Sequence, residues 1–386
     1  MGELTSDEIK DAIAAGEIGA ITLDTSIFDA NGLRLEGGLL QRLEQFRGSG
    51  IDFVLSEIVA NEVVAHVTKG ASEARAQFES ACKGLEKSWL ASKELLDATG
   101  AAVFQGDTPK ELAQRRFDAF VEKMDCAIIE SSEHVDVKEL LRRYFVPESP
   151  FSQKENKKNE FPDAFALLSL EGWAESSGKK MLIVSKDGDW TRFCKDSELL
   201  VAVDDLGTAL SLFHRDASVA CNALSLRLQN GGFPNLVEAI EDAIYRHIDR
   251  MDFIVDAEAA YSFEDEIGDY EILDVVIGDG GMAEIEPIDA GDDYLVAKIP
   301  VSVGMRVECD FSFSIKDGID KDYVPIGSAS VSTEKTLSFD VLVTLGTPVS
   351  EADSIDDIEV TGKGRLYLEF GYVEPNWHED PDSDYY

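Results

Sequence analysis

Carboxylate side chains occur in four separate segments of the sequence, each directly after an apolar run or within a predicted helix. In open α/β sheets, ligands bind outside the carboxyl ends of the parallel strands, so acids placed there are expected to meet. The sheet order third, second, first, fourth, counted along the predicted strands, would bring these strand ends side by side. The acids are Asp24 after the run 20–23, Glu57 and Glu62 after the run 51–56, Asp163 after Pro162, and Asp187 after the run 180–184.

The crowding of several carboxylates predicts a divalent cation. Carboxylates within reach of one another repel and cannot all stay ionised without compensating charge. A pocket that offers only oxygen ligands selects Mg²⁺ or Mn²⁺. Such an ion orients an attacking water, lowers the pKa of that water and stabilises charge on the leaving oxygen. This chemistry suits in-line hydrolysis of phosphodiester bonds, leaving a 5′-phosphate and a 3′-hydroxyl, and needs no His, Cys or Ser nucleophile.

The segments that must position these acids alternate between strands and helices. Apolar runs predict buried parallel strands, and apolar residues at helical spacing predict helices between them. Thr5 and Glu8 have the spacing of a capping box at the start of a first helix. The pattern predicts an α/β domain, a parallel sheet flanked by helices, over residues 1–250. Its strands are expected at 20–24, 51–56, 180–185 and 199–203, an inserted helical arm without strands at 70–145, and a connecting helix at 235–250.

From residue 251 the apolar pattern changes to strict alternation. Odd-numbered positions from Leu295 to Ile315 are apolar or small, which is the pattern of a strand with one buried face. This run is too long for one flat strand, so we expect it to bend or turn at Pro300 or Gly304. Residues 251–375 are expected to form a separate antiparallel, sandwich-like β domain, followed by a mobile acidic tail at 376–386.

The net charge of −41 restricts how the chain could approach nucleic acid. The last 136 residues hold 33 acids and 7 bases, and the first 250 hold 43 acids and 28 bases. Such a chain repels phosphate unless bound cations or a local basic patch intervene. Lys138 to Lys195 holds 11 bases and 9 acids, so phosphate contacts are expected there, with a solvated charged surface as the alternative. In this stretch the bases concerned are Lys154, Lys157, Lys158, Lys186, Arg192 and Lys195. Phosphate contacts are also expected from the arginine pairs of the helical arm, Arg115–Arg116 and Arg142–Arg143.

The cysteines and the apolar runs indicate the compartment. Five scattered cysteines without a CxxC pair argue against a disulfide framework or a zinc–thiolate site. No run approaches the ~18 apolar residues that span a bilayer, and the polar first ten residues do not resemble a signal peptide. We therefore expect a cytoplasmic protein without membrane attachment.

Taken in order, the four acidic segments resemble the motifs of the PIN domain nucleases, over roughly residues 18 to 215. The resemblance implies a fold of that kind, Mg²⁺- or Mn²⁺-dependent endoribonuclease activity, and RNA as the substrate, with single-stranded DNA as the alternative. Its motifs are similar to Leu23-Asp24-Thr25-Ser26, the segment from Ser56 to Val63, Phe161-Pro162-Asp163-Ala164, and the segment from Ser185 to Trp190.

The resemblance also implies roles for single residues. Metal ligands are expected at Asp24, Glu62, Asp163 and Asp187. Asp189 is expected as a catalytic helper. Ser26 stands where the family has a small hydroxyl or amide residue that supports the site. Substrate binding is expected of Ser26 and, on the basis of the local positive charge and not of the resemblance, of Lys157, Lys158 and Lys186.

Each of these residues also has an ordinary structural explanation. Acids such as Glu57 and Asp163 are favoured in the first turn of a helix by the helix dipole. Asp187 and Asp189 around a glycine would make a good turn, and His66 suits a structural position. For the whole protein, the alternative is a catalytically silent PIN-like scaffold whose acidic β domain regulates, binds a protein partner or forms homo-oligomers.

Overall fold

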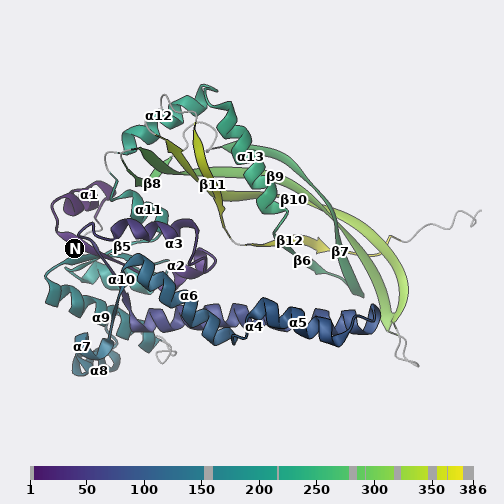
Figure 1. Cartoon of the computed structure of the whole chain (residues 1–386), viewed down its shortest axis with the longest axis horizontal. Helices are drawn as coiled ribbons and strands as arrows, with labels where there is room; N and C mark the ends of the chain where they lie inside the picture. Colours follow the sequence, from purple (N-terminus) through teal and green to yellow (C-terminus); the bar gives the residue numbers. More distant parts are fainter. Residues whose placement is uncertain are drawn as a thin grey trace, which may run out of the picture. The chain divides into compact units, whose positions relative to one another are not determined.

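The computed structural model describes two compact units (Figure 1). Unit 1 comprises Met1–Ser218 and Glu286–Ala290, and unit 2 comprises Val219–Ile285 and Gly291–Tyr386. Among the described residues, no helix combines the length and apolar character that a bilayer crossing requires. The described ranges are 4–151, 160–214, 217–277, 285–291, 293–316, 323–346, 354–362 and 364–376, so Lys154, Lys157, Lys158 and the predicted tail beyond residue 376 lie outside them.

Unit 1 is built on a parallel five-stranded sheet of order β3-β2-β1-β4-β5, as the fold class predicted. All residues of the central strand β1 are buried, which is typical of a parallel strand covered on both faces. The predicted strand order was wrong, because β4 lies beside β1 and not beside β2. The strands are β1 (Ile18–Leu23), β2 (Asp52–Ser56), β3 (Ala127–Ile129), β4 (Lys180–Val184) and β5 (Leu200–Val203).

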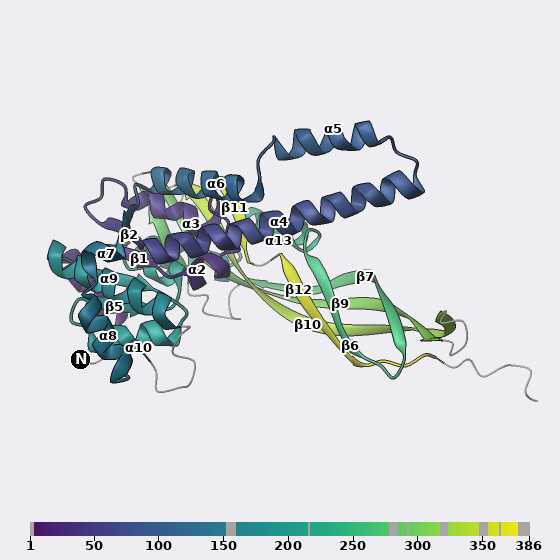
Figure 2. The ribbon, with the colours of Figure 1, turned by 90° about the horizontal axis from the view of Figure 1, so that it is seen from below.

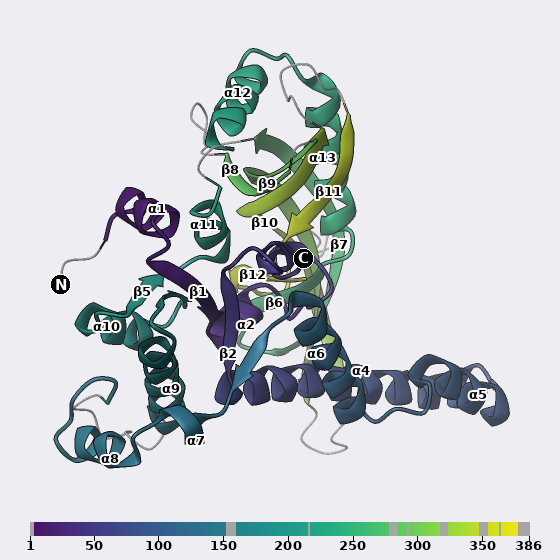
Figure 3. The ribbon, with the colours of Figure 1, turned by 60° about the vertical axis from the view of Figure 1, so that its left-hand side comes forward.

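Helices cover both faces of the sheet because the chain crosses it in two directions. From β1 it moves to β2 and β3, then returns to β4 and β5, and right-handed crossovers place the two groups of helices on opposite faces. Figure 3 shows α9 and α10 on one side and α6 on the other. The direction reverses between β1 and β4, which is where ligands bind in such sheets.

The helices of unit 1 have the following bounds. The first helix is α1 (Ser6–Ala14), and its predicted capping box is present. The connections from β1 to β2 and from β2 to β3 contain α2 (Thr25–Ala30), α3 (Gly38–Gln41), the 3₁₀ helix η1 (Arg42–Phe46), α4 (Glu57–Ser88), α5 (Lys93–Phe104) and α6 (Pro109–Met124). The later ones are α7 (Ser131–His134), α8 (Val137–Phe145), α9 (Phe161–Ser177), α10 (Gly188–Asp196) and α11 (Leu206–Ser211), and β8 (Glu286–Ala290) completes the unit.

The segment predicted as one helical arm is divided into a hairpin and a returning part. The distal half of α4 and all of α5 form the α4–α5 hairpin, residues 70–107 (Figure 2). Helix α6 then packs on the sheet unit and buries Phe117 and Phe120. The prediction that this segment lacks strands was wrong, because it contains β3. That strand is only three residues long, and the apolar run that contains it, residues 126–129, is too short to stand out from the helical pattern around it.

Unit 2 contains the predicted antiparallel sheet, of order β11-β10-β9-β7, and a second sheet in which β12 and β6 pair in parallel. Strand β9 runs without interruption through Pro300 and Gly304 and pairs with β10 along its whole length. The strands are β6 (Asp252–Glu258), β7 (Ser262–Ile277), β9 (Tyr294–Lys316), β10 (Tyr323–Gly346), β11 (Ile355–Thr361) and β12 (Arg365–Tyr372). Helices α12 (Ser218–Gln229) and α13 (Pro234–Ile248), predicted before the boundary at 250, group with this unit.

The two sheets of unit 2 share a core, as in a sandwich. Phe311 and Phe313 of β9 are almost fully buried, and the ring of Phe311 lies 5.5 Å from that of Phe370 on β12. The outer strands of the larger sheet are β7 and β11. Strand β7 carries the acids Glu264, Asp265, Glu266, Asp269, Glu271 and Asp274.

Candidate active site

Asp24 lies at the point where β1 ends and α2 begins. Its backbone N–H donates to the carbonyl oxygen of Val184 over 2.9 Å, which ties the end of β1 to the end of β4. The residue is only 5% exposed. Burial raises the pKa of the Asp24 carboxyl above its ordinary value, and hydrogen bonds from the Ser26 and Ser185 hydroxyls partly oppose this increase.

The two serines connect Asp24 to the segment after β4. Ser185 Oγ donates to Asp24 Oδ2 over 2.8 Å and accepts from the backbone N–H of Asp187 over 3.0 Å. Ser26 Oγ donates to the same carboxylate oxygen and accepts from the backbone N–H of Lys186 over 3.1 Å. Ser26 therefore orients Asp24 in this structure. The Lys186 side chain is exposed.

Glu62 and Glu57 on α4 have different partners. Thr25 Oγ1 donates to Glu62 Oε2 over 2.7 Å. Because Thr25 directly follows Asp24 in the sequence, this hydrogen bond holds Glu62 close to Asp24. Glu57, at the first position of α4, accepts from the backbone N–H of Ser131 over 2.7 Å and so serves the start of α7. Of the two acids, Glu62 is therefore the one directed to the site.

Asp163 lies in the first turn of α9, where the N-terminal end of a helix favours an acid. The Trp190 Nε1–H donates to Asp163 Oδ1 over 3.1 Å. Burial, together with the negative charges of Asp24, Asp187 and Glu62, raises the pKa of Asp163 to about 6, against the lowering effect of the Trp190 hydrogen bond. The structure thus brings acids from four elements close enough for each of the other three to act on Asp163.

Asp187 and Asp189 differ in their surroundings. Asp187 is the N-cap of α10, and its Oδ1 accepts from the backbone N–H of Asp189 over 2.7 Å. The Asp189 carboxylate accepts from Arg192 Nη2 over 2.6 Å in an exposed ion pair. Asp187 therefore combines a capping position with proximity to Asp163, whereas the Asp189 carboxylate is directed to an arginine.

The donor set fits a hard divalent cation. All four converging side chains offer carboxylate oxygens, the ligands that suit Mg²⁺ and Mn²⁺. Within the described ranges, no group of three His, Cys, Asp or Glu side chains stands close enough to hold one ion. Coordination of one ion by three of these carboxylates would therefore need their side chains to move closer together.

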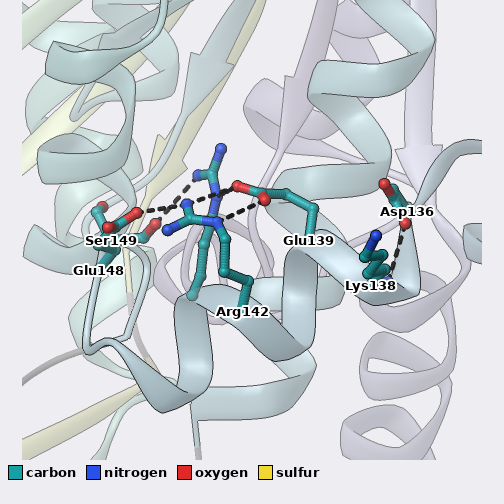
Figure 4. Close-up of polar contacts among 7 residues, drawn as sticks. Asp136, Lys138, Glu139, Arg142, Glu148 and Ser149 are labelled. Atoms are coloured by element: carbon teal, nitrogen blue, oxygen red, sulfur yellow. Dashed lines mark hydrogen bonds and ion pairs between the residues drawn. The ribbon is translucent and has the colours of Figure 1, made fainter.

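The arginine pairs predicted to contact phosphate are engaged with acids of the same unit. Arg142 binds both Glu139 and Glu148, with an Nε–Oε2 distance of 2.7 Å to Glu139, and Arg143 binds Glu139 over 2.9 Å (Figure 4). Arg115 pairs with Asp107, and Arg116 forms a bidentate pair with Glu36. A phosphate group would have to compete with, or bind beside, a carboxylate at each of these sites.

Three residues of the site were not identified from the sequence as its supports: Thr25, Ser185 and Trp190. Their sequence signals are weak, since Thr25 and Ser185 are small hydroxyl residues next to a strand end. Trp190 is 1% exposed, and a tryptophan near a strand and a helix is most simply explained as part of a core. His66 fits its structural explanation, because its Nδ1 lies 2.9 Å from Asp29 Oδ1.

The comparison with protein families agrees with this geometry. Residues 21–190 match the PIN domain family, and this range includes all four converging acids. No curated protein and no solved structure matched the chain. Residues 21–190 therefore form a PIN-like domain, and the chain carries a separate antiparallel β region after it.

Proposed function

We propose that this protein is a nuclease that hydrolyses phosphodiester bonds of RNA with the help of Mg²⁺ or Mn²⁺. The observation that carries the proposal is the convergence of Asp24, Glu62, Asp163 and Asp187 where the sheet changes direction. PIN domains are generally nucleases, and the family typically uses divalent metals. Single-stranded DNA is the alternative substrate.

In this proposal one group of side chains binds the ion, and a second group orients the first. Asp24, Glu62, Asp163 and Asp187 would hold the cation, with Ser26, Ser185 and Thr25 keeping Asp24 and Glu62 in place. A bound divalent ion supplies charge neutralisation at the phosphate and activation of the attacking water. Asp189 would help from the rim of the site, and the exposed Lys186 side chain would contact a phosphate on the substrate strand.

The rival function is a catalytically silent scaffold. The observation in its favour is the spacing of the acids, because no three ligating side chains within the described part of the chain already form an ion site. In that case the acidic β region would be the interaction surface for a protein partner. Isothermal titration with Mn²⁺ separates the two, because a scaffold would show no site that depends on the carboxylates.

The decisive experiment follows cleavage of a labelled single-stranded RNA, and of a DNA of the same sequence, by the purified full chain. Asp24→Asn and Asp187→Asn should each lower the Mn²⁺-stimulated rate by at least about 100-fold, because the ligand charge is lost while the shape is kept. Glu175→Gln is the matched control, since this exposed acid lies on α9 away from the site. Unchanged cleavage in Asp24→Asn or Asp187→Asn would refute the proposed nuclease.

A further inference from the structure

The α4–α5 hairpin has no core of its own. Between Val67 and Ala113 no described side chain is buried, and only part of the facing sides of α5 and the distal half of α4 is half-buried. The α4 and α5 segments of this hairpin meet chiefly where the ring of Phe78 lies 5.2 Å from that of Phe104, in an edge-on contact. A groove of about 520 Å³ runs between them, lined on its apolar side by Phe78, Cys82, Leu96 and Phe104.

The end of the hairpin carries the most exposed large apolar side chains of the described structure. Leu90 is 87% exposed and Trp89 is 81% exposed, and both lie in the turn between the helices. Leu95 and Val103 on α5 are 63% and 57% exposed. An isolated helix as short as α5, with its 12 residues, is marginal in water, because most helix stability in proteins comes from packing an apolar face. The hairpin therefore presents an apolar surface that a partner would cover.

We propose that the partner is a second copy of this chain, whose hairpin packs against the first to form an antiparallel four-helix bundle. Two helical hairpins related by a two-fold axis bury their apolar faces against each other in the common architecture of such bundles. The grooves of both hairpins would receive the Trp89–Leu90 turn of the other copy.

Charge identifies a second copy as the occupant. The chain carries −41, so most of its surface repels another copy, whereas the hairpin holds only six acids and four bases. Its distal part, residues 82–96, holds three lysines and two glutamates, a net +1, and its proximal parts, residues 70–81 and 97–107, hold four acids and one arginine, a net −3. In an antiparallel pair each distal part lies against the proximal part of its partner, so opposite charges face each other twice.

The oligomeric state of the full chain, measured by sedimentation velocity over a range of concentrations, tests the proposal. The wild type should form dimers. The double variant Trp89→Glu, Leu90→Glu should dimerise at least about 100-fold more weakly, as expected when large apolar side chains that fill a pocket of the partner are lost. Phe145→Glu is the matched control: Phe145 is 75% exposed on α8, outside the hairpin, and this variant should dimerise like the wild type.

A charge exchange tests the antiparallel arrangement itself. Lys83→Glu, Lys87→Glu places acids at both distal parts, so this variant should not self-associate. It should form a mixed dimer with Glu73→Lys, Glu79→Lys, in which both facing pairs are again opposite in charge. Circular dichroism checks that the helices persist in each variant.

Three results would overturn the proposal. A wild type that stays monomeric at high concentration has no such interface. A dimer that survives the Trp89 and Leu90 changes is formed by another surface. A monomer whose hairpin variants instead lose affinity for single-stranded RNA would assign the hairpin to substrate binding. None of these results depends on nuclease activity, so the proposed function is tested separately.

Discussion

Replacing Asp163 by Asn should stabilise the metal-free protein while removing its activity. In the folded state this carboxyl is partly buried and faces three other acids, so its ionised form is disfavoured and its pKa rises from 3.8 to about 6. Asparagine has the same shape, carries no charge, and its oxygen can still accept from Trp190. The substitution therefore removes a source of repulsion that only a bound cation could otherwise neutralise.

The size of the stabilisation expected from Asp163→Asn, and its dependence on pH, follow from the raised pKa of Asp163. Because the folded state holds the proton more tightly than the unfolded state, the free energy of unfolding falls as pH rises from about 4 to about 6. The full difference between the ordinary and the raised pKa of Asp163 corresponds to about 3 kcal/mol in the free energy of unfolding. Asp163 is only half-buried, so screening by water reduces this, and we expect Asp163→Asn to gain about 1–2 kcal/mol above about pH 7 and nothing near pH 4.

The assay is urea unfolding in EDTA, followed by tryptophan fluorescence, since the buried Trp190 reports on the site itself. Added Mn²⁺ should reverse the ranking, because a ligand at about 100 times its dissociation constant stabilises the wild type by about 2.7 kcal/mol. Glu175→Gln should follow the wild type in both conditions. A variant that is less stable than the wild type in EDTA, or equally stabilised by Mn²⁺, would show that the acids do not repel one another as described.

The remaining predictions concern the supports of the site and the core of unit 2. Ser185→Ala should weaken Mn²⁺ binding by about 10-fold in isothermal titration, because Asp24 loses a hydrogen bond that orients it; unchanged affinity would contradict this. Trp190→Phe removes a hydrogen bond that lowers the pKa of Asp163, so the pH at which Mn²⁺ binding reaches half its maximum should move upward; a downward shift would contradict the assignment. Phe311→Ala should destabilise unit 2 by about 3–5 kcal/mol in thermal unfolding followed by circular dichroism, since its side chain is fully buried; a loss below about 1 kcal/mol would mean that the cavity collapses.

Continuous apolar runs made most of the parallel sheet predictable. Strands β1, β2 and β4 coincide with such runs because both of their faces are covered in unit 1. Strand β5 also coincides with one, although it borders the sheet and only Leu200 is fully buried. Strand β3 was not predicted because its apolar run, residues 126–129, is only four residues long and stands inside a largely helical stretch. Its absence from the prediction also produced the wrong strand order. The pairing of β12 with β6 joins residues more than a hundred positions apart, and no local pattern specifies such a partner.

The acids of the site could be predicted because strand ends and helix starts are recognisable from the local sequence. The residues that hold these acids by hydrogen bonds could not be predicted in this way. Ser185 reaches Asp24 only because Leu23 of β1 is paired with Val184 of β4, and this register is a property of the assembled sheet. The Trp190 contact with Asp163 likewise depends on how α10 packs beside α9. Hydrogen bonds between elements far apart in sequence therefore remained outside the prediction.

The acidic side chains along β7 have a consequence for the solubility of unit 2. Within the described strands, β7 and β11 each pair on one side only, so backbone N–H and C=O groups along their outer edges remain open to another chain. Charged side chains on such an edge discourage a second sheet from adding to it. Protection against aggregation thereby explains part of the strong negative charge of this unit. This explanation does not require that the acids bind a basic partner.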